Sequence, residues 1–163
     1  MIRRTLLRGF GHLPSRARRF VIRWASPTWT AGAVAILERD DGRWLMVSPV
    51  YRKGWSLPGG LIDRGEDPAT AVIREFAEEL GITIAVTGDP WIVYDSVMRR
   101  VDAVFRAELV DNTDLDAIRV QTPELDGVGW FEPSAPPALE TEAEDALTLH
   151  SAVTSGGPTV LWR

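Results

Sequence analysis

The sequence predicts an α/β fold, on three observations. Segments rich in branched and aromatic residues alternate with segments of helical periodicity, a pattern typical of a sheet that carries helices. The chain has 163 residues, which suits one domain with its own core. It contains no internal repeat and no region whose composition marks a second folded domain. These features indicate a single mixed α/β domain.

Most of the predicted strands belong to two hairpins. In chain order, strands are expected at residues 30–38, 43–48, 83–87, 91–97, 101–110 and 128–132. A turn signal at Asp40-Asp41-Gly42 joins the first two strands. Residues 98–100 join the two long strands farther along the chain. A second helix is expected at about residues 139–153, after a break rich in proline.

The chain is expected to divide into three parts. These are a basic N-terminal arm at residues 1–27, the folded domain at 28–153 and a C-terminal tail at 154–163. Residues 1–26 carry seven arginines and no acid, although the whole chain has a net charge of −5. The domain itself is therefore acidic, and an anionic substrate would need local cations or a metal ion.

Two interpretations of the arm are open. Phe20, Val21 and Trp24 would share one face of a short helix, with arginines on the opposite face. Such a helix commonly packs on its own domain with the arginines in water. Alternatively, it contacts a membrane surface, a nucleic acid or the second subunit of a homodimer. An arginine-rich start is also compatible with an organelle transit peptide, which is the less favoured interpretation.

The composition excludes several classes of protein. The chain has no cysteine, which excludes disulfides, thiolate zinc sites and cysteine nucleophiles. This composition fits a reducing compartment, and we expect a cytoplasmic location. The sequence has no apolar run of about 20 residues, the length that a transmembrane helix needs.

The helix that follows Asp67 has clear start and stop signals. Asp67 suits the N-cap position, and Pro68 suits the first helical position. Gly81 suits the position after the last turn. At about 100° per residue, the apolar residues form one stripe: Ala69, Val72, Ile73, Phe76 and Leu80. One face of this helix is therefore expected to be buried.

Three carboxylates occupy the stripe beside this apolar face. Glu75, Glu78 and Glu79 would repel one another unless cations neutralise them, so this stripe predicts a divalent metal site. Oxygen donors favour Mg²⁺ or Mn²⁺. Arg74 can reach Glu78 one turn ahead and Glu66 in the preceding loop. The only histidines, His12 and His150, lie far from the cluster in sequence, which argues against zinc.

The spacing of these residues resembles the Nudix box, Gly-x5-Glu-x7-Arg-Glu-U-x-Glu-Glu-x-Gly-U, in which U is a bulky aliphatic residue. All nine specified positions are occupied, by Gly60, Glu66, Arg74, Glu75, Phe76, Glu78, Glu79, Gly81 and Ile82. Phe76 is a mild departure, because this position is usually aliphatic. The preceding sequence Leu-Pro-Gly-Gly and the later Trp-Phe strand also fit. The chain is thus similar to Nudix hydrolases over about residues 28–153.

The resemblance implies a fold, a reaction and a set of residues. It implies an α/β/α sandwich with a mixed β-sheet, and metal-dependent hydrolysis of the diphosphate linkage of a nucleoside diphosphate linked to X, with water attacking phosphorus. By the same resemblance, the metal would be held by Glu75, Glu78, Glu79 and the Gly59 carbonyl, and the loop would be braced by Arg74 and Glu66. The general base is a glutamate, for which we consider Glu78, then Glu124 and then Glu132.

The substrate is less specified than the reaction. Arg52 and Lys53 are candidates for phosphate contacts, although residues of this kind are equally common in solvated loops. Trp29 and Tyr94 are candidates for stacking on a nucleobase, although tryptophan more often simply buries area. The downstream residues that mark several substrate classes of the family are absent. A nucleotide-type small molecule is the substrate that the resemblance implies.

Two alternatives to the hydrolase remain. One is a Nudix-fold module that binds or senses a nucleotide without turnover. The complete set of carboxylates argues against it, since such a module need not keep every metal ligand. The other is a related isomerase of isoprenoid diphosphates, whose best-known type uses a cysteine that this chain lacks.

Overall fold

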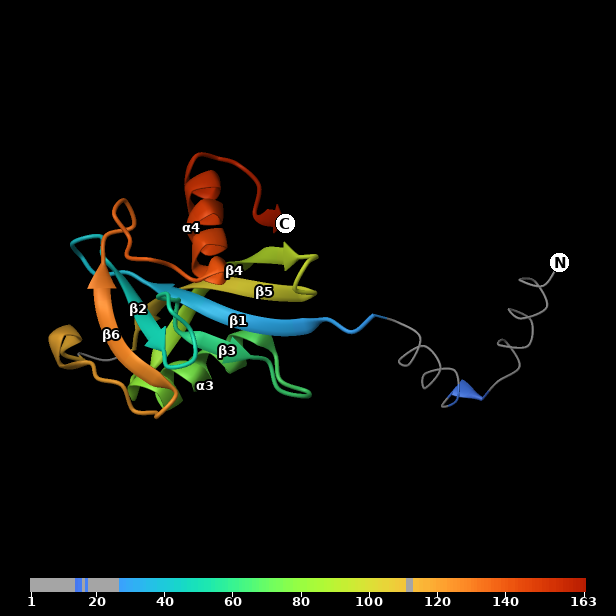
Figure 1. Ribbon diagram of the computed structural model, residues 1–163, viewed down its shortest axis with the longest axis horizontal. Coiled ribbons are helices and arrows are strands. Elements are labelled where there is room, and N and C mark those ends of the chain that lie inside the picture. The colour runs from blue at the N-terminus through green and yellow to red at the C-terminus, as the bar shows by residue number, and fades with distance from the viewer. Residues whose placement is uncertain (1–13, 16, 18–26, 111–112) are drawn as a thin grey trace.

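A five-stranded mixed sheet in the order β3-β1-β5-β4-β7 carries one long helix on each face (Figure 1). The computed structural model describes residues 14, 15, 17, 27–110 and 113–163. The strands of this sheet are β1 (Thr30–Leu37), β3 (Gly59–Leu61), β4 (Ile84–Asp95), β5 (Arg100–Leu109) and β7 (Val160–Trp162). A separate two-stranded sheet contains β2 (Trp44–Pro49) and β6 (Leu125–Phe131). The helices are α3 (Pro68–Leu80), the short 3-10 helix η1 (Leu115–Ala117) and α4 (Thr141–Thr154).

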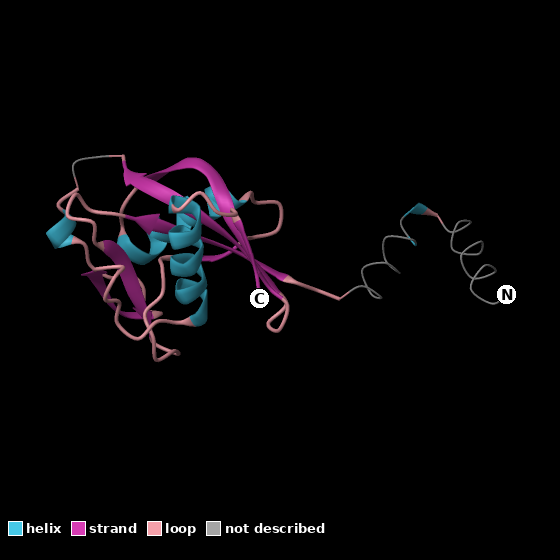
Figure 2. Cartoon of the chain, turned by 90° about the horizontal axis from the view of Figure 1, so that it is seen from above, coloured by secondary structure: helices cyan, strands magenta, loops and turns pink. Residues whose placement is uncertain are grey.

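Alternate residues of β1 enter two different cores. On one face of the sheet, Ala33 and Ala35 pack in a cluster with Phe76 of α3. On the other face, Ile36 packs in a cluster with Leu149 of α4. Side chains of a strand point to opposite faces in turn, so a strand that is covered on both faces has an almost continuous apolar sequence. The expected α/β/α sandwich is confirmed (Figure 2).

The sheet is mixed, as expected from the resemblance. β1 pairs in parallel with β5 and antiparallel with β3. β4 pairs antiparallel with β5 and in parallel with β7. The hairpin between β4 and β5 is confirmed, and Arg99 lies in its turn with φ 52°. The two strands expected at 83–87 and 91–97 are a single strand, β4, with an irregularity between Thr87 and Trp91.

The first predicted hairpin is wrong in its pairing. Arg39 N–H donates to the Arg43 carbonyl at 2.9 Å, so the turn forms as expected. Beyond one bridge between Glu38 and Trp44, however, the two strands separate into different sheets. The reason is that β1 gains partners on both edges within the large sheet, while β2 pairs with the distant β6. Long-range pairing that buries both faces outweighs the local pairing of a hairpin.

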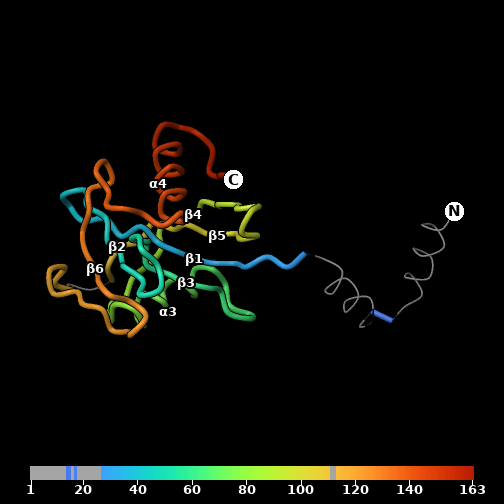
Figure 3. Tube along the Cα trace, viewed as in Figure 1, coloured from blue at the N-terminus to red at the C-terminus, as the bar shows by residue number. Residues whose placement is uncertain are grey.

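The end of the expected C-terminal tail, Val160–Trp162, is part of the sheet. β7 pairs in parallel with β4, and the end of the chain returns beside it (Figure 3). The rings of Tyr94 and Trp162 stack with centroids 4.3 Å apart and an interplanar angle of 7°. Within the described part of the chain, no helix is long and apolar enough to cross a membrane. The residues of the predicted arm lie mostly outside the described residues.

Gly59, at the start of β3, has a backbone conformation and a close neighbour that should make any larger residue destabilising at this position. Its φ is +140°, and a Cβ there would overlap the carbonyl oxygen of Ala33 on β1. Gly65 also has a positive φ, of +88°, but a Cβ at Gly65 would meet no atom within 4 Å. We therefore expect Gly59→Ala to lower the free energy of unfolding by roughly 3 kcal/mol. Gly65→Ala should lower it by only about 1 kcal/mol.

Urea denaturation of the two variants measures this difference. The matched control is Gly65→Ala, because it carries the conformational cost without the overlap. Equal losses in the two variants would show that β1 and β3 do not approach closely at Gly59.

Candidate functional site

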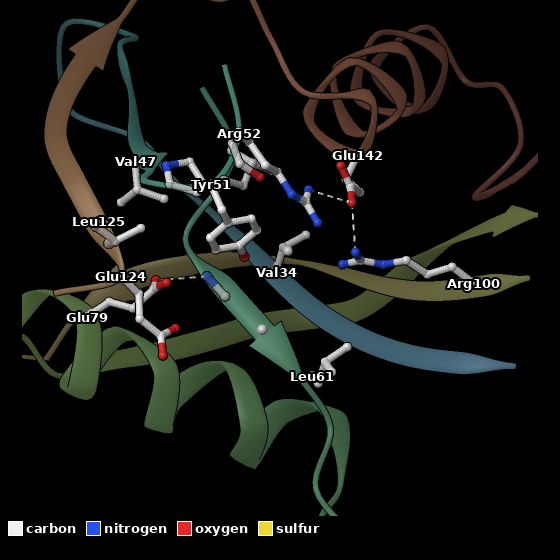
Figure 4. Close-up of a pocket in the computed structure, with 15 residues that line it drawn as sticks. Val34, Val47, Tyr51, Arg52, Leu61, Glu79, Arg100, Glu124, Leu125 and Glu142 are labelled. Atoms are coloured by element: carbon white, nitrogen blue, oxygen red, sulfur yellow. Dashed lines mark hydrogen bonds and ion pairs between the residues drawn. The ribbon is translucent and has the colours of Figure 1, made fainter. Parts of the chain in front are cut away.

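A cavity of about 200 Å³ lies where strands from both sheets meet the two long helices (Figure 4). β3 and the end of α3 form one wall, and the start of α4 and β5 contribute to the opposite side. Its polar and charged lining residues are Tyr51, Arg52, Ser56, Glu79, Arg100, Glu124 and Glu142, together with the backbone of Gly59 and Gly60. The cavity thus brings together residues that are far apart in sequence.

The caps of α3 fix where its carboxylates lie. The Asp67 side chain accepts hydrogen bonds from the backbone amides of Ala69 and Thr70, at 3.1 Å each. Gly81 ends the helix in the left-handed conformation with φ 70°. Both predicted caps are confirmed. Because Val72 and Phe76 are fully buried against the sheet, the neighbouring stripe of glutamates is held beside β3.

Arg74 connects this helix to the preceding loop. Its Nε donates to Glu66 at 3.1 Å, and its Nη2 donates to the other oxygen of Glu66 at 3.2 Å. Glu66 also accepts from the backbone amide of Asp63 at 3.0 Å. These hydrogen bonds, that of Arg74 first, hold the pKa of Glu66 below its ordinary value. A second Nη2 bond, to the Leu61 carbonyl at 3.2 Å, ties the helix to the end of β3.

The same arginine also forms ion pairs with two of the three helix carboxylates, which partly neutralises their negative charge. Its Nη1 donates to Glu75 at 2.9 Å and to Glu78 at 3.1 Å. The Glu78 side chain is 61% exposed, whereas that of Glu75 is 18% exposed. Burial raises the pKa of Glu75 despite this ion pair. Glu75 also lies directly against Gly60, where a side chain would overlap its carboxylate.

Glu79 differs from its neighbours because no ion pair among the described residues includes it. The Gly59 amide donates to one of its oxygens at 3.2 Å. Burial raises the pKa of Glu79 to about 7, the Gly59 hydrogen bond opposes this shift, and the charges of Glu75, Glu124 and Glu78 add to it. A carboxylate that is buried and surrounded by like charges is the group that a bound cation would stabilise most.

Glu124 lies across the cavity from α3. The pairing of β6 with β2 brings it there, and the Val50 amide donates to the Glu124 carbonyl at 2.9 Å. Figure 4 shows the side chains of Glu79 and Glu124 in the same part of the cavity. Glu132, the weaker candidate, is exposed and does not line the cavity.

These residues fit a hard divalent cation by their chemistry. All the side-chain donors are carboxylate oxygens, which Mg²⁺ and Mn²⁺ prefer. In the arrangement described, no three histidine, aspartate or glutamate side chains of the described chain converge closely enough to form a complete metal centre. Arg74 bridges Glu75 and Glu78 instead. Residues Glu75, Glu78 and Glu79, with the backbone of Gly59 beside them, are those that would hold the ion.

The predicted substrate-binding residues separate into two groups. Arg52 lines the cavity. Lys53 is exposed and is absent from the lining. Trp29 and Tyr94 also lie outside the lining. Their rings pack edge to face, with the ring centroids 6.5 Å apart. Of the three helix carboxylates only Glu79 lines the cavity, and the cavity therefore brings Arg52 together with Glu79, and not with Lys53, Trp29 or Tyr94.

The cavity also contains three residues that the sequence analysis did not identify. Tyr51 is 73% exposed at the mouth, with the Arg52 guanidinium 5.4 Å from its ring centre. Arg100 and Glu142 lie on β5 and α4. A signal for Arg100 was present, because Arg100 and Asp102 share the face of β5 that otherwise buries Val104. Two charges on a buried face of a strand indicate an internal ion pair.

Comparison with known proteins agrees with this geometry. A model of the NUDIX domain matches residues 28–151. The chain is 30% identical to a MutT-like protein of Streptomyces ambofaciens over 138 residues, which cover 82% of this chain and 83% of that protein. It is 35% identical to an RNA pyrophosphohydrolase of Acidiphilium cryptum over 125 residues, which cover 67% of this chain and 73% of that protein.

Solved structures support the same conclusion. A MutT NUDIX hydrolase from Burkholderia pseudomallei superposes with a TM-score of 0.61 at 29% identity, over 75% of this chain and 98% of that chain. A NUDIX hydrolase from Nitrosomonas europaea shares the fold with a TM-score of 0.67 at 19% identity, over 85% of this chain and 81% of that chain. Since the domain model covers most of the sequence and includes the complete glutamate-rich helix, this chain belongs to the Nudix hydrolase family.

Proposed function

We propose that this chain hydrolyses the diphosphate linkage of a nucleoside diphosphate joined to a group X, with Mg²⁺ or Mn²⁺ as cofactor and water as the nucleophile. The observation that carries this proposal is the partly buried Glu79 carboxylate, which lines the cavity with Glu124 and has no cationic partner among the described residues. Relatives that include an RNA pyrophosphohydrolase and a hydrolase of a CMP-linked phosphonate support a nucleotide substrate.

In this proposal the residues have separate roles. Glu75, Glu78 and Glu79 would hold the cation, with the Gly59 carbonyl as a further oxygen donor. When bound, the cation would neutralise charge on the diphosphate and lower the pKa of the attacking water. Arg74 and Glu66 keep the loop between β3 and α3 in position, which their hydrogen bonds support.

We propose Glu124, rather than Glu78, as the general base. Glu78 is paired with Arg74 and does not line the cavity. Glu124 lies opposite the helix carboxylates, where it can accept a proton from water in the cavity. Phosphoryl transfer requires little from the protein beyond such positioning and electrostatic stabilisation.

We also propose a cytoplasmic location, which the absence of cysteine supports. The homodimer and the contacts of the arm at residues 1–27 stay predictions, because the arm lies mostly outside the described residues.

Removing the charge of Glu79 should abolish most of the turnover. We expect Glu79→Gln to lower kcat/KM roughly 100-fold or more, because a lost carboxylate ligand weakens the stabilisation of charge in the transition state. The measurement is release of phosphate-containing products from a panel of nucleoside diphosphate derivatives with Mg²⁺ or Mn²⁺. Glu144→Gln, on the exposed side of α4, is the control for a change of net charge. Metal binding without any turnover by the wild-type chain would favour the nucleotide-binding or regulatory module.

The same variant should stabilise the metal-free protein. The pKa of Glu79 is about 7 in the folded chain, so its buried charge costs stability progressively as pH rises from about 4.5 to 7. We expect metal-free Glu79→Gln to be more stable than wild type by roughly 1–3 kcal/mol at pH 8. The difference should shrink toward pH 5. Thermal unfolding in EDTA at the two pH values measures the difference. A variant that is less stable than wild type at both pH values would show that the charge of Glu79 does not destabilise the folded protein.

Glu124→Gln tests the choice of general base. We expect kcat to fall by roughly 100-fold or more, with little change in KM, because proton removal occurs only during the chemical step. Glu78→Gln should instead raise the Mg²⁺ concentration needed for half-maximal activity, because a metal ligand is lost. Steady-state kinetics at several Mg²⁺ concentrations separates the two effects. If Glu124→Gln keeps wild-type kcat while Glu78→Gln loses it, the assignment is reversed.

A further inference from the structure

An ion-pair cluster separates the cavity described above from a second one. The second cavity has a volume of about 380 Å³. Arg52, Arg100 and Glu142 line both cavities and thus form a partition between them. They come from three separate parts of the chain: the loop after β2, the first residue of β5 and the first turn of α4.

One carboxylate oxygen of Glu142 bridges both arginines of this partition, and Arg100 Nε also donates to the buried Asp102 at 2.8 Å. Glu142 Oε1 accepts from Arg52 Nη1 at 2.8 Å and from Arg100 Nη1 at 2.7 Å (Figure 4). The side chains of Arg100 and Glu142 are each only 18% exposed. Burial alone would raise the pKa of Glu142, but a hydrogen bond from its own amide, the hydrogen bond from Arg52 and the charge of Arg100 outweigh burial and lower it. Glu142 is therefore an anion held between two guanidinium groups.

The partition is also the cationic end of the catalytic cavity. Arg52 and Arg100 are the only basic residues of the described chain in its lining. Glu79 and Glu124 lie at the other end (Figure 4). An anionic substrate is repelled by the carboxylate end in the absence of metal and attracted by the arginine end. Two guanidinium groups that converge on one oxygen have the geometry that binds phosphate strongly.

We propose that Arg52 and Arg100 bind a phosphate group of the substrate, and that Glu142 occupies its position until the substrate displaces it. Glu142 is then a specificity-determining residue, because only a ligand that binds the two arginines more strongly than the Glu142 carboxylate does can displace it. The identity of the ligand as a diphosphate rests on the proposed function. The exchange of one anion for another at the same cations requires no other change of charge in the partition.

This proposal differs measurably from a purely structural role of the cluster. If Glu142 only fastens α4 to the sheet, its removal lowers stability and leaves anion binding unchanged. If Glu142 competes with phosphate, its removal strengthens anion binding. Glu142→Gln is suitable, because the amide keeps the shape and an acceptor oxygen for the arginines but loses the charge.

The probe is inorganic pyrophosphate in EDTA, with binding measured by isothermal titration calorimetry. We expect Glu142→Gln to bind pyrophosphate roughly tenfold more tightly than wild type, since loss of the competing charge removes about 1.4 kcal/mol from the cost of binding. Glu144→Gln has the same change of net charge, is exposed and lies two residues farther along α4, so it should bind as wild type does. Equal affinities for wild type and Glu142→Gln would overturn the proposal.

Arg52→Gln provides a second, independent test. It tests phosphate binding by the arginines even if circular dichroism shows that Glu142→Gln does not fold. We expect this variant to bind pyrophosphate at least tenfold more weakly than wild type. Unchanged binding in a folded Arg52→Gln protein would overturn the proposal.

The binding assay uses no turnover, so its result is separate from the proposed hydrolysis. Tighter pyrophosphate binding by Glu142→Gln in a chain that hydrolyses no nucleotide would refute the hydrolase and keep the partition as an anion site. If Glu142→Gln hydrolyses nucleotides normally, with unchanged KM and unchanged pyrophosphate binding, the proposed role of Glu142 is refuted and the proposed hydrolysis is kept.

Discussion

The burial of the apolar face of α3 against the sheet is the constraint on which the site depends. Phe76 and Val72 are fully buried, and the caps at Asp67 and Gly81 fix the ends of the helix. Rotation of the helix would expose its apolar stripe, so the adjacent carboxylates cannot turn away from β3. Their mutual repulsion is therefore an obligatory cost of the fold, reduced for two of them by Arg74.

The remaining electrostatic cost is concentrated at Glu79. This carboxylate is partly buried among like charges, and the backbone amide of Gly59 is its only hydrogen-bond donor among the described contacts. In the proposed reaction, that unrelieved charge is what makes cation binding favourable. The opposite end of the cavity has the reverse arrangement, with two guanidinium groups on one carboxylate oxygen of Glu142. The site thus has an anionic end and a cationic end, which matches a metal-bound diphosphate in charge.

Much of the fold could be predicted from local patterns, and the failures have physical causes. The helix with its caps and the β4–β5 hairpin depend on neighbouring residues and were predicted correctly. The hairpin expected between residues 30 and 48 was wrong, because β1 and β2 each find a distant partner that buries more surface. The sequence pattern does not predict β7, because a strand of three residues with one partner strand carries too weak a pattern.

The sequence by itself determined the carboxylate face of α3 and the family to which the chain belongs. Both depend on offsets within one helix and its preceding loop, and helical geometry converts such offsets directly into positions in space. Only the tertiary structure decided that Glu124 faces Glu79, that Lys53 lies outside the cavity and that Arg52 shares Glu142 with Arg100. These contacts join residues from different strands, loops and helices, and their distances are set by strand pairing and packing rather than by spacing along the chain.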